Sequence, residues 1–126
     1  MKYIIDSSAW IEYLEGSKSG EIVNKILDED NEIFIIPLII SEVISKTKRK
    51  KQNYELAYET LIENAKINEI SPKIAKEAGL LHAQMKDKIS SISLADTMII
   101  TAAKALSAKI ITCDEHFKGL KEIILI

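Results

Sequence analysis

The chain has 126 residues, of which 47% are hydrophobic and 29% charged, and its formal net charge is −2 at pH 7. This length and composition predict a single globular domain over residues 1–126 with a sizeable core, and the charge argues against a strongly basic nucleic-acid scaffold while allowing a local basic patch. Cys113 is the only cysteine, which excludes an internal disulfide framework and indicates a reducing compartment.

The N-terminal residues do not have the pattern of a secretory signal, because the short apolar run after Lys2 reaches Asp6 almost at once. No stretch of the sequence approaches the roughly 18 consecutive apolar residues that a membrane-spanning helix needs. We therefore expect a cytoplasmic protein with no membrane partner.

Short apolar runs alternate with segments whose apolar residues recur at helical spacing. In chain order the pattern predicts a strand at 2–5, helices at 7–14 and 20–27, a strand at 33–36, helices at 38–51 and 54–65, a strand at 67–70, helices at 72–85 and 94–106, and strands at 109–112 and 123–125. Strands and helices alternate in the manner of parallel sheets with right-handed crossovers. The prediction is therefore an α/β protein, a three-layer α/β/α fold with a central parallel five-stranded sheet.

Local signals place several of the predicted helix ends. Gly16 is expected to stop the first helix, and Pro37 to end the second strand and open the helix that follows. Ser93 and Asp96 have the Ser-x-x-Asp spacing of a capping box at the start of a largely buried helix.

Four acids from separated parts of the chain are predicted to meet at one edge of the sheet. Asp6 and Asp114 follow strands, and Glu42 lies in the early turns of the helix after the second strand. Asp96 begins a helix that must run antiparallel to the next strand, so it reaches the same edge. Sites in open α/β sheets form beyond the carboxyl ends of the strands. We therefore interpret all four acids as catalytic and metal-binding residues.

Carboxylates without a basic neighbour repel one another, and a divalent cation would relieve that repulsion. Oxygen ligands with no His or Cys pair nearby indicate Mg²⁺ or Mn²⁺ rather than zinc. Such an ion can activate water for in-line attack on a phosphodiester. Ser7, Ser8 and Thr112 are candidates for positioning phosphate or water through their hydroxyls. Taken singly, the acids have ordinary structural explanations as caps, turn residues or solvated residues, and only their convergence favours a site.

Five cations close the helix that carries Glu42. They are candidates for contacts with the phosphate backbone of a nucleic acid: Lys46, Lys48, Arg49, Lys50 and Lys51. The alternative is a solvated helix end that suits the helix dipole. The sequence leaves both interpretations open.

Four segments resemble the four acidic blocks of PIN domains, in order and at fitting spacing: residues 4–8, 37–43, 94–99 and 111–117. The branch they resemble most is the VapC toxins of type II toxin–antitoxin pairs. The resemblance implies a PIN-like fold and a Mg²⁺- or Mn²⁺-dependent endoribonuclease. It also implies a homodimer and an antitoxin partner that blocks the acidic site. By this resemblance Asp6, Glu42 and Asp96 are the core metal-binding acids and Asp114 is the fourth.

Three alternatives stay open. The chain could be a PIN-type RNA-processing nuclease outside a toxin–antitoxin pair, or a catalytically silent binding module. A phospho-receiver domain is also a small α/β unit with an acidic site. That chemistry needs an acceptor Asp after the third strand and a Lys after the fifth, and this chain has Ile70-Ser71 at the first position and no lysine at the second.

Overall fold

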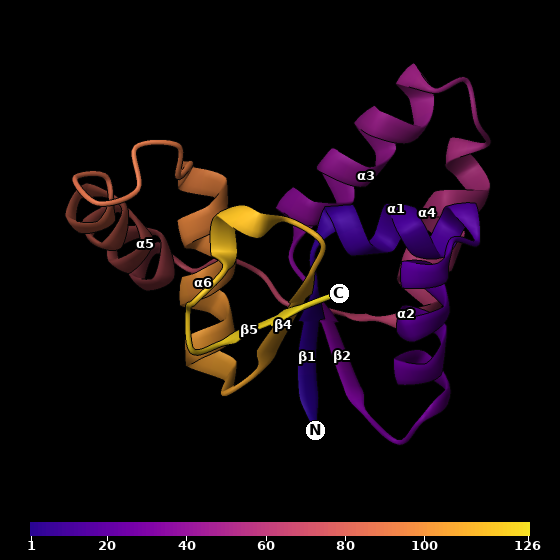
Figure 1. The fold of residues 1–126 in the computed structure, drawn as a ribbon, viewed down its shortest axis with the longest axis horizontal. Helices are drawn as coiled ribbons and strands as arrows, with labels where there is room; N and C mark the ends of the chain where they lie inside the picture. Colours follow the sequence, from indigo (N-terminus) through magenta and orange to yellow (C-terminus); the bar gives the residue numbers. More distant parts are fainter.

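The computed structural model describes residues 1–126 and contains one five-stranded sheet in which every neighbouring pair is parallel (Figure 1). The strands are β1 (Lys2–Ile5), β2 (Glu32–Ile35), β3 (Lys66–Ile67), β4 (Lys109–Thr112) and β5 (Ile123–Leu125). Their order across the sheet is β3-β2-β1-β4-β5, so β1 is the central strand.

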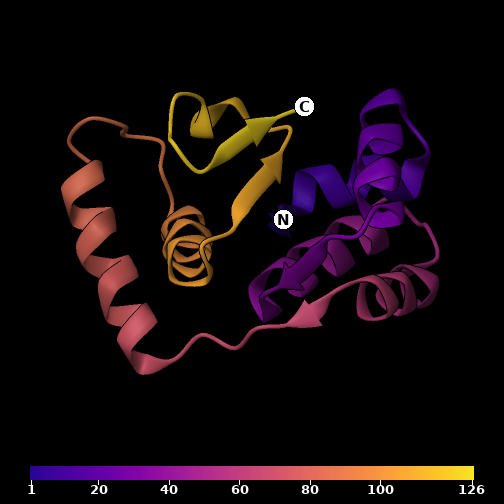
Figure 2. The same cartoon turned by 90° about the horizontal axis from the view of Figure 1, so that it is seen from below.

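Six helices cover the two faces of this sheet. They are α1 (Ser7–Glu15), α2 (Lys18–Asp28), α3 (Pro37–Arg49), α4 (Tyr54–Asn64), α5 (Pro72–Met85) and α6 (Leu94–Leu106), and a 3₁₀ turn, η1 (Glu115–Phe117), joins β4 to β5. Figure 2 shows α5 and α6 on one side of the sheet and α1 to α4 on the other. The predicted three-layer α/β/α arrangement is therefore confirmed. None of the helices combines the length and apolar character needed to cross a membrane.

The central strands are nearly continuous apolar runs, as expected where both faces of a sheet are covered. Ile4, Ile5, Ile110 and Ile111 are fully buried and belong to one hydrophobic cluster that joins both helical layers. In the register of β1 and β4, Ile5 lies opposite Ile111, and the Asp6 N–H donates to the Ile111 carbonyl at 2.8 Å. Thus Asp6 stands at the carboxyl end of β1 in fixed register with β4.

Most of the predicted elements are present, and the differences are local. The third strand is Lys66–Ile67 rather than residues 67–70, because this exposed edge strand pairs with β2 over only two residues. The second helix begins at Lys18 rather than at residue 20, because the Ser17 side chain caps it by accepting from the Gly20 N–H at 3.1 Å. Gly16 ends α1 in the left-handed conformation, as predicted.

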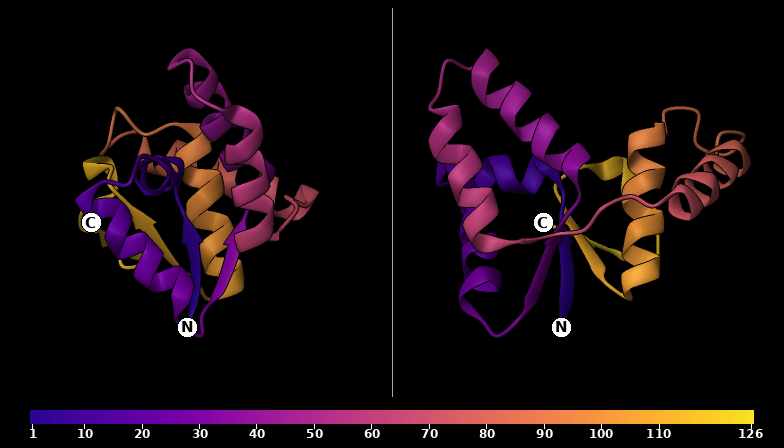
Figure 3. Two further views of the ribbon diagram at one scale, coloured as in Figure 1. Left: turned by 90° about the vertical axis from the view of Figure 1, so that its right-hand side faces the viewer. Right: turned by 180° about the vertical axis from the view of Figure 1, so that it is seen from behind.

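Two parts of the fold extend away from the sheet. Helix α3 rises past the strand ends and α4 returns beside it, and a long segment then crosses the molecule to α5 (Figure 3, right). Helix α5 packs mainly against α6, and its only fully buried side chain is Ala78. Helix α3 thus begins at the carboxyl ends of the strands and projects beyond them.

The α1–α2 packing predicts a large effect of a small substitution. A Cβ at Gly20 would lie 2.2 Å from the Glu12 carbonyl oxygen, so Gly20→Ala requires the two helix backbones to separate. We expect Gly20→Ala to lower the free energy of unfolding by about 1–3 kcal/mol in a denaturant titration. The matched control is Gly79→Ala in α5, where a Cβ would meet nothing within 4 Å. That control should be neutral or stabilise by up to about 1 kcal/mol, and equal stability of the two variants would contradict the prediction.

Candidate active site

The four predicted acids lie at the carboxyl ends of the strands. The ends of β1 and β4 and the first turns of α3 and α6 meet at the upper edge of the sheet in Figure 1. Asp6 follows β1, Glu42 lies in α3, Asp96 lies in the first turn of α6, and Asp114 follows β4. Helix α6 does run antiparallel to β4, and this direction brings its N-terminus to the same edge.

Asp6 is held by hydroxyl groups from two different elements. Its Oδ2 accepts from the Thr112 hydroxyl at 2.9 Å and from the Ser8 hydroxyl at 3.1 Å. The two hydroxyl oxygens lie 3.2 Å apart, and they accept backbone N–H groups in turn: Cys113 donates to Ser8, and Asp114 donates to Thr112. Only 5% of Asp6 is exposed, and Thr112 is fully buried. Ser8 and Thr112 thus hold a catalytic candidate in place, and the substrate-positioning role expected of them from the sequence stays a prediction.

Burial raises the pKa of Asp6 above its usual range, and the Asp114 charge adds a smaller rise. The hydroxyls of Thr112 and Ser8 and the Ser7 N–H oppose this rise, because they favour the ionised carboxyl group. Burial therefore makes the ionised form of the Asp6 carboxyl group less stable than it would be in water.

Glu42 is the second acid whose pKa is raised. Burial raises its pKa, the negative charges of Asp6 and Asp96 raise it further, and the Ser7 hydroxyl opposes them. Its Oε1 atom is buried and has no hydrogen-bond partner. A buried polar atom without a partner is rare in folded proteins. The electrostatic coupling places Asp6, Glu42 and Asp96 in one neighbourhood.

Asp96 has a structural role as well as a position in the site. It forms the predicted capping box: Ser93 N–H donates to Asp96 Oδ2 at 2.9 Å, and Asp96 N–H donates to the Ser93 hydroxyl at 3.1 Å. The Ile92 carbonyl just before this cap contacts His82 Nε2 at 3.2 Å, which ties the start of α6 to α5. Only the folded loop before α6 brings His82 and Ile92 together.

Asp114 caps η1, and its carboxylate lies beside a histidine. Its Oδ1 accepts from the His116 N–H at 3.0 Å and lies 3.4 Å from His116 Nδ1. Its carboxylate contributes to the raised pKa of Asp6, so the two groups sense each other. Protonated His116 would partly neutralise the charge of Asp114. The other three acids have no such basic partner.

The acids do not form a preassembled metal site, since no group of three or more His, Cys, Asp or Glu side chains is arranged to hold one ion. Asp6, Asp96 and Asp114 each accept hydrogen bonds within the protein through one carboxylate oxygen. The donor set nevertheless fits a hard divalent cation. All the donors are oxygens, the Glu42 Oε1 atom is unpartnered, and no lysine or arginine forms an ion pair with Asp6, Glu42 or Asp96.

The structure divides the basic run, which sequence analysis treated as one group. Lys50 pairs with Glu15, and the Lys48 ammonium lies 5.3 Å from the centre of the Tyr54 ring. Lys51 lies beyond the helix end with a φ of 57°. Lys46 and Arg49 instead line a cleft of about 370 Å³ beside Glu42. Ser41 and Ser45 also line this cleft, and no sequence signal had singled them out.

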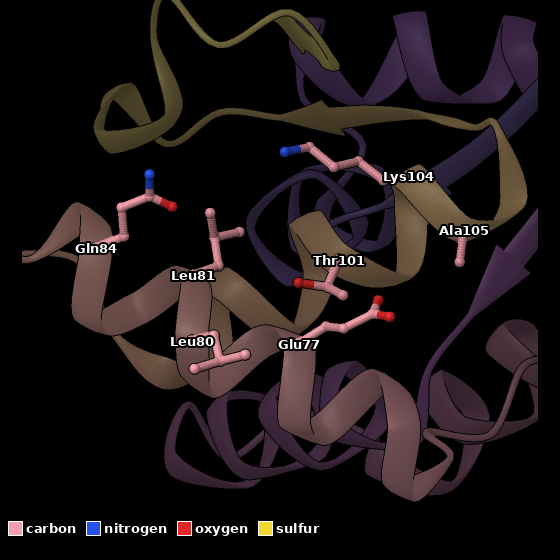
Figure 4. Close-up of a pocket in the computed structure, with 7 residues that line it drawn as sticks. All are labelled: Glu77, Leu80, Leu81, Gln84, Thr101, Lys104 and Ala105. Atoms are coloured by element: carbon pink, nitrogen blue, oxygen red, sulfur yellow. The ribbon is translucent and has the colours of Figure 1, made fainter.

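A second cleft, of about 510 Å³, lies between α5 and α6 and away from the acids (Figure 4). Glu77 and Lys104 are its charged residues, and Leu80 on its rim is 63% exposed. Thr101 lies in it with a buried hydroxyl that has no partner. The side chains here do not assemble a set of acids, so the cleft offers no alternative active site.

The parallel sheet and the uncompensated carboxylates at its rim define an α/β domain with an acidic site at the carboxyl ends of its strands. The chain belongs to the PIN domain family, whose model matches residues 3–123. No curated protein sequence matches the chain.

Solved structures show the same fold over nearly the whole chain. The toxin–antitoxin complex from Klebsiella pneumoniae is 20% identical with a TM-score of 0.76, over 97% of this chain and 95% of that one. VapBC2 from Rickettsia felis, solved with a promoter DNA fragment, is 23% identical with a TM-score of 0.76, over 100% and 98%. Mycobacterium tuberculosis VapC20, described as a sarcin–ricin loop cleaving toxin, is 11% identical with a TM-score of 0.71, over 93% and 90%.

The hydroxyl network around Asp6 predicts opposite effects for two similar substitutions. Thr112→Val removes a donor to Asp6 and an acceptor for the Asp114 N–H, so we expect it to lower the free energy of unfolding by about 1–3 kcal/mol. Thr101→Val removes a buried hydroxyl that has no partner and should be neutral or stabilising. Thermal or denaturant unfolding of both variants tests this, and equal destabilisation would show that the Thr112 hydrogen bonds carry no special weight.

The raised pKa of Asp6 predicts how stability varies with pH. The folded state keeps the Asp6 proton to a higher pH than the unfolded chain does, so stability falls as pH rises from the usual aspartate value through the raised one. Asp6→Asn has no such loss. In EDTA we expect Asp6→Asn to be more stable than the parent at pH 8, with the difference shrinking as the pH falls towards about 3.

The control for this titration is Asp30→Asn, which removes an exposed carboxylate. It should follow the parent at every pH. A constant difference between Asp6→Asn and the parent across the titration would contradict the pKa assignment.

Proposed function

We propose that the protein is a metal-dependent endoribonuclease whose catalytic acids are Asp6, Glu42, Asp96 and Asp114. The observation that carries this proposal is the electrostatic coupling of Asp6, Glu42 and Asp96 without a basic ion-pair partner. Raised pKa values of coupled carboxyl groups at a rim are typical of functional sites. Membership of the PIN domain family supports the same assignment.

The residues of the site divide into groups with different tasks in the proposed reaction. Asp6, Glu42 and Asp96 would hold Mg²⁺ or Mn²⁺ through carboxylate oxygens that make no hydrogen bond within the protein. A bound ion of this kind supplies an activated water and charge stabilisation for phosphodiester hydrolysis. Thr112 and Ser8 fix the orientation of the Asp6 carboxylate, and Ser93 fixes that of Asp96. Asp114 lies close enough to Asp6 to serve as the fourth acid.

We propose further that the protein is the toxin of a toxin–antitoxin pair. Its fold is shared with a toxin–antitoxin complex and with VapBC2, and one structural neighbour is a toxin described as cleaving the sarcin–ricin loop. An antitoxin partner and an RNA substrate follow from this proposal. The homodimer implied by the family resemblance stays a prediction, which the mass of the purified protein in solution would test.

The sheet order argues against the phospho-receiver alternative. Receivers of that class have the strand order 2-1-3-4-5, whereas this sheet has the order 3-2-1-4-5. A nuclease without an antitoxin, or a silent binding module, would have the same fold as the proposed toxin. An antitoxin gene beside this one would separate the toxin from an RNA-processing nuclease, and an assay of cleavage separates both from a silent module.

The proposed function predicts metal-dependent cleavage of cellular RNA that Asp96→Asn abolishes. Asparagine can still accept the Ser93 N–H, so this variant keeps the helix cap and loses the charge. Purified parent and variant are incubated with total RNA in Mn²⁺, Mg²⁺ or EDTA. We expect fragments only for the parent with metal. Glu63→Gln, on the exposed face of α4, is the control with the same change of charge and should cleave as the parent does.

The same proteins provide a readout that does not need the right RNA. Metal that binds only the folded state at about 100 times its dissociation constant should add about 2.7 kcal/mol to stability. The gain should appear in the parent and in Glu63→Gln, and shrink in Asp96→Asn. An equal gain in all three proteins would remove Asp96 from the metal site.

A further inference from the structure

The cleft beside Glu42 has a chemical character unlike that of the other clefts. Its lining contains no hydrophobic side chain and consists of Ser7, Ser41, Glu42, Ser45, Lys46 and Arg49. Five of the six come from α3, the helix that projects past the strand ends (Figure 3). The cleft therefore lies directly beside one of the proposed metal-binding acids, along α3.

The two cations of this cleft are free for a ligand. Lys46 and Arg49 are exposed and form no ion pair with any acid, although Glu42 lies one turn from Lys46 on the same helix. Two other cations of the run are already engaged, Lys50 by Glu15 and Lys48 by the Tyr54 ring. An anion that enters this cleft therefore meets unpaired positive charge.

The lining is suited to phosphate and ribose, because it consists of hydroxyl and charged side chains. It contains no aromatic ring on which a single-stranded base could stack. The exposed rings of Tyr54 and Tyr58 line another cleft, together with Glu55 and Glu59. Those two carboxylates repel a phosphate chain, so the favourable path lies on the serine side of α3.

Position along the helix separates these cations from the reacting phosphate. Lys46 and Arg49 lie one and two turns beyond Glu42, which is about 6 and 10 Å along the axis. A phosphate held by Arg49 is therefore a neighbour of the phosphate that reacts at the acids.

We infer that this cleft binds the sugar–phosphate backbone of a single-stranded RNA beside the scissile phosphate, through Lys46 and Arg49 and without reading bases. This inference rests on the proposed function. The Ser41 and Ser45 hydroxyls lie in the same cleft and can donate to phosphate oxygens or to the ribose 2′-hydroxyl. This cleft would then bind RNA of any sequence with equal affinity, and selectivity for a particular RNA must come from other contacts.

The test compares two double variants with the same change of charge. Lys46→Ala/Arg49→Ala removes the cations of the cleft, and Lys48→Ala/Lys50→Ala removes two engaged cations outside it. Binding of fluorescent oligouridine and oligocytidine is measured in EDTA, so that cleavage plays no part, at salt concentrations from about 50 to 200 mM.

The inference predicts at least a tenfold loss of affinity at the lowest salt for the cleft variant, equal for the two RNAs. The slope of log K against log salt should fall in magnitude by about 1.4, because each phosphate contact on a single strand contributes about 0.7. The control variant should keep the parent slope. Equal losses in the two variants, a loss that depends on the base, or a parent that binds neither RNA would overturn the inference.

Cleavage by the parent with metal, assayed separately, decides the proposed function. A parent that cleaves RNA while the cleft variant binds like the control would leave the nuclease standing and remove this cleft. A parent that binds RNA through the cleft but never cleaves it would support the cleft and contradict the proposed nuclease.

Discussion

The structure depends on one buried carboxylate at the junction of its central strand and first helix. Asp6 ends β1, begins α1, and accepts from the hydroxyl at the end of β4. The parallel register of β1 and β4 brings Thr112 to this position, and the backbone N–H of Asp6 extends the ladder by one more bond to Ile111. Sheet register and site geometry are thus fixed by the same few hydrogen bonds, and a slip of one residue between these strands would destroy both.

The acids of the site lower the stability of the fold that holds them. Asp6 and Glu42 are partly or fully removed from water, they repel each other, and no cation of the chain compensates them. The positive charges near the site instead lie along α3, at Lys46 and Arg49. A protein optimised for stability alone would neutralise the acids or move them into solvent. Uncompensated acids beside unpaired cations are what a site for a metal ion and a phosphate chain requires, and such sites commonly reduce stability.

Much of this could be predicted from the sequence, because strong local signals and topology agree. Alternating elements gave the parallel sheet, and Ser93 with Asp96 gave the start of α6. The convergence of acids followed from where strands end. The roles of individual side chains in the site could not be predicted, because they depend on contacts between residues far apart in the sequence. Nothing local in Thr112 distinguishes a hydroxyl that binds substrate from one that holds Asp6, and five adjacent cations look alike until Glu15 and Tyr54 occupy two of them. The short third strand was misplaced because two exposed residues carry almost no pattern.

The capping box at the start of α6 has a genetic consequence. The Asp96 oxygen that closes the helix accepts a hydrogen bond, which an asparagine amide oxygen does equally well. Aspartate and asparagine codons differ by a single nucleotide. A cell burdened by the activity proposed here could therefore acquire a folded but inactive protein in one mutational step, with the charge of a single side chain changed. Selection against the activity need not remove the gene, and inactive relatives should accumulate as intact, well-folded chains.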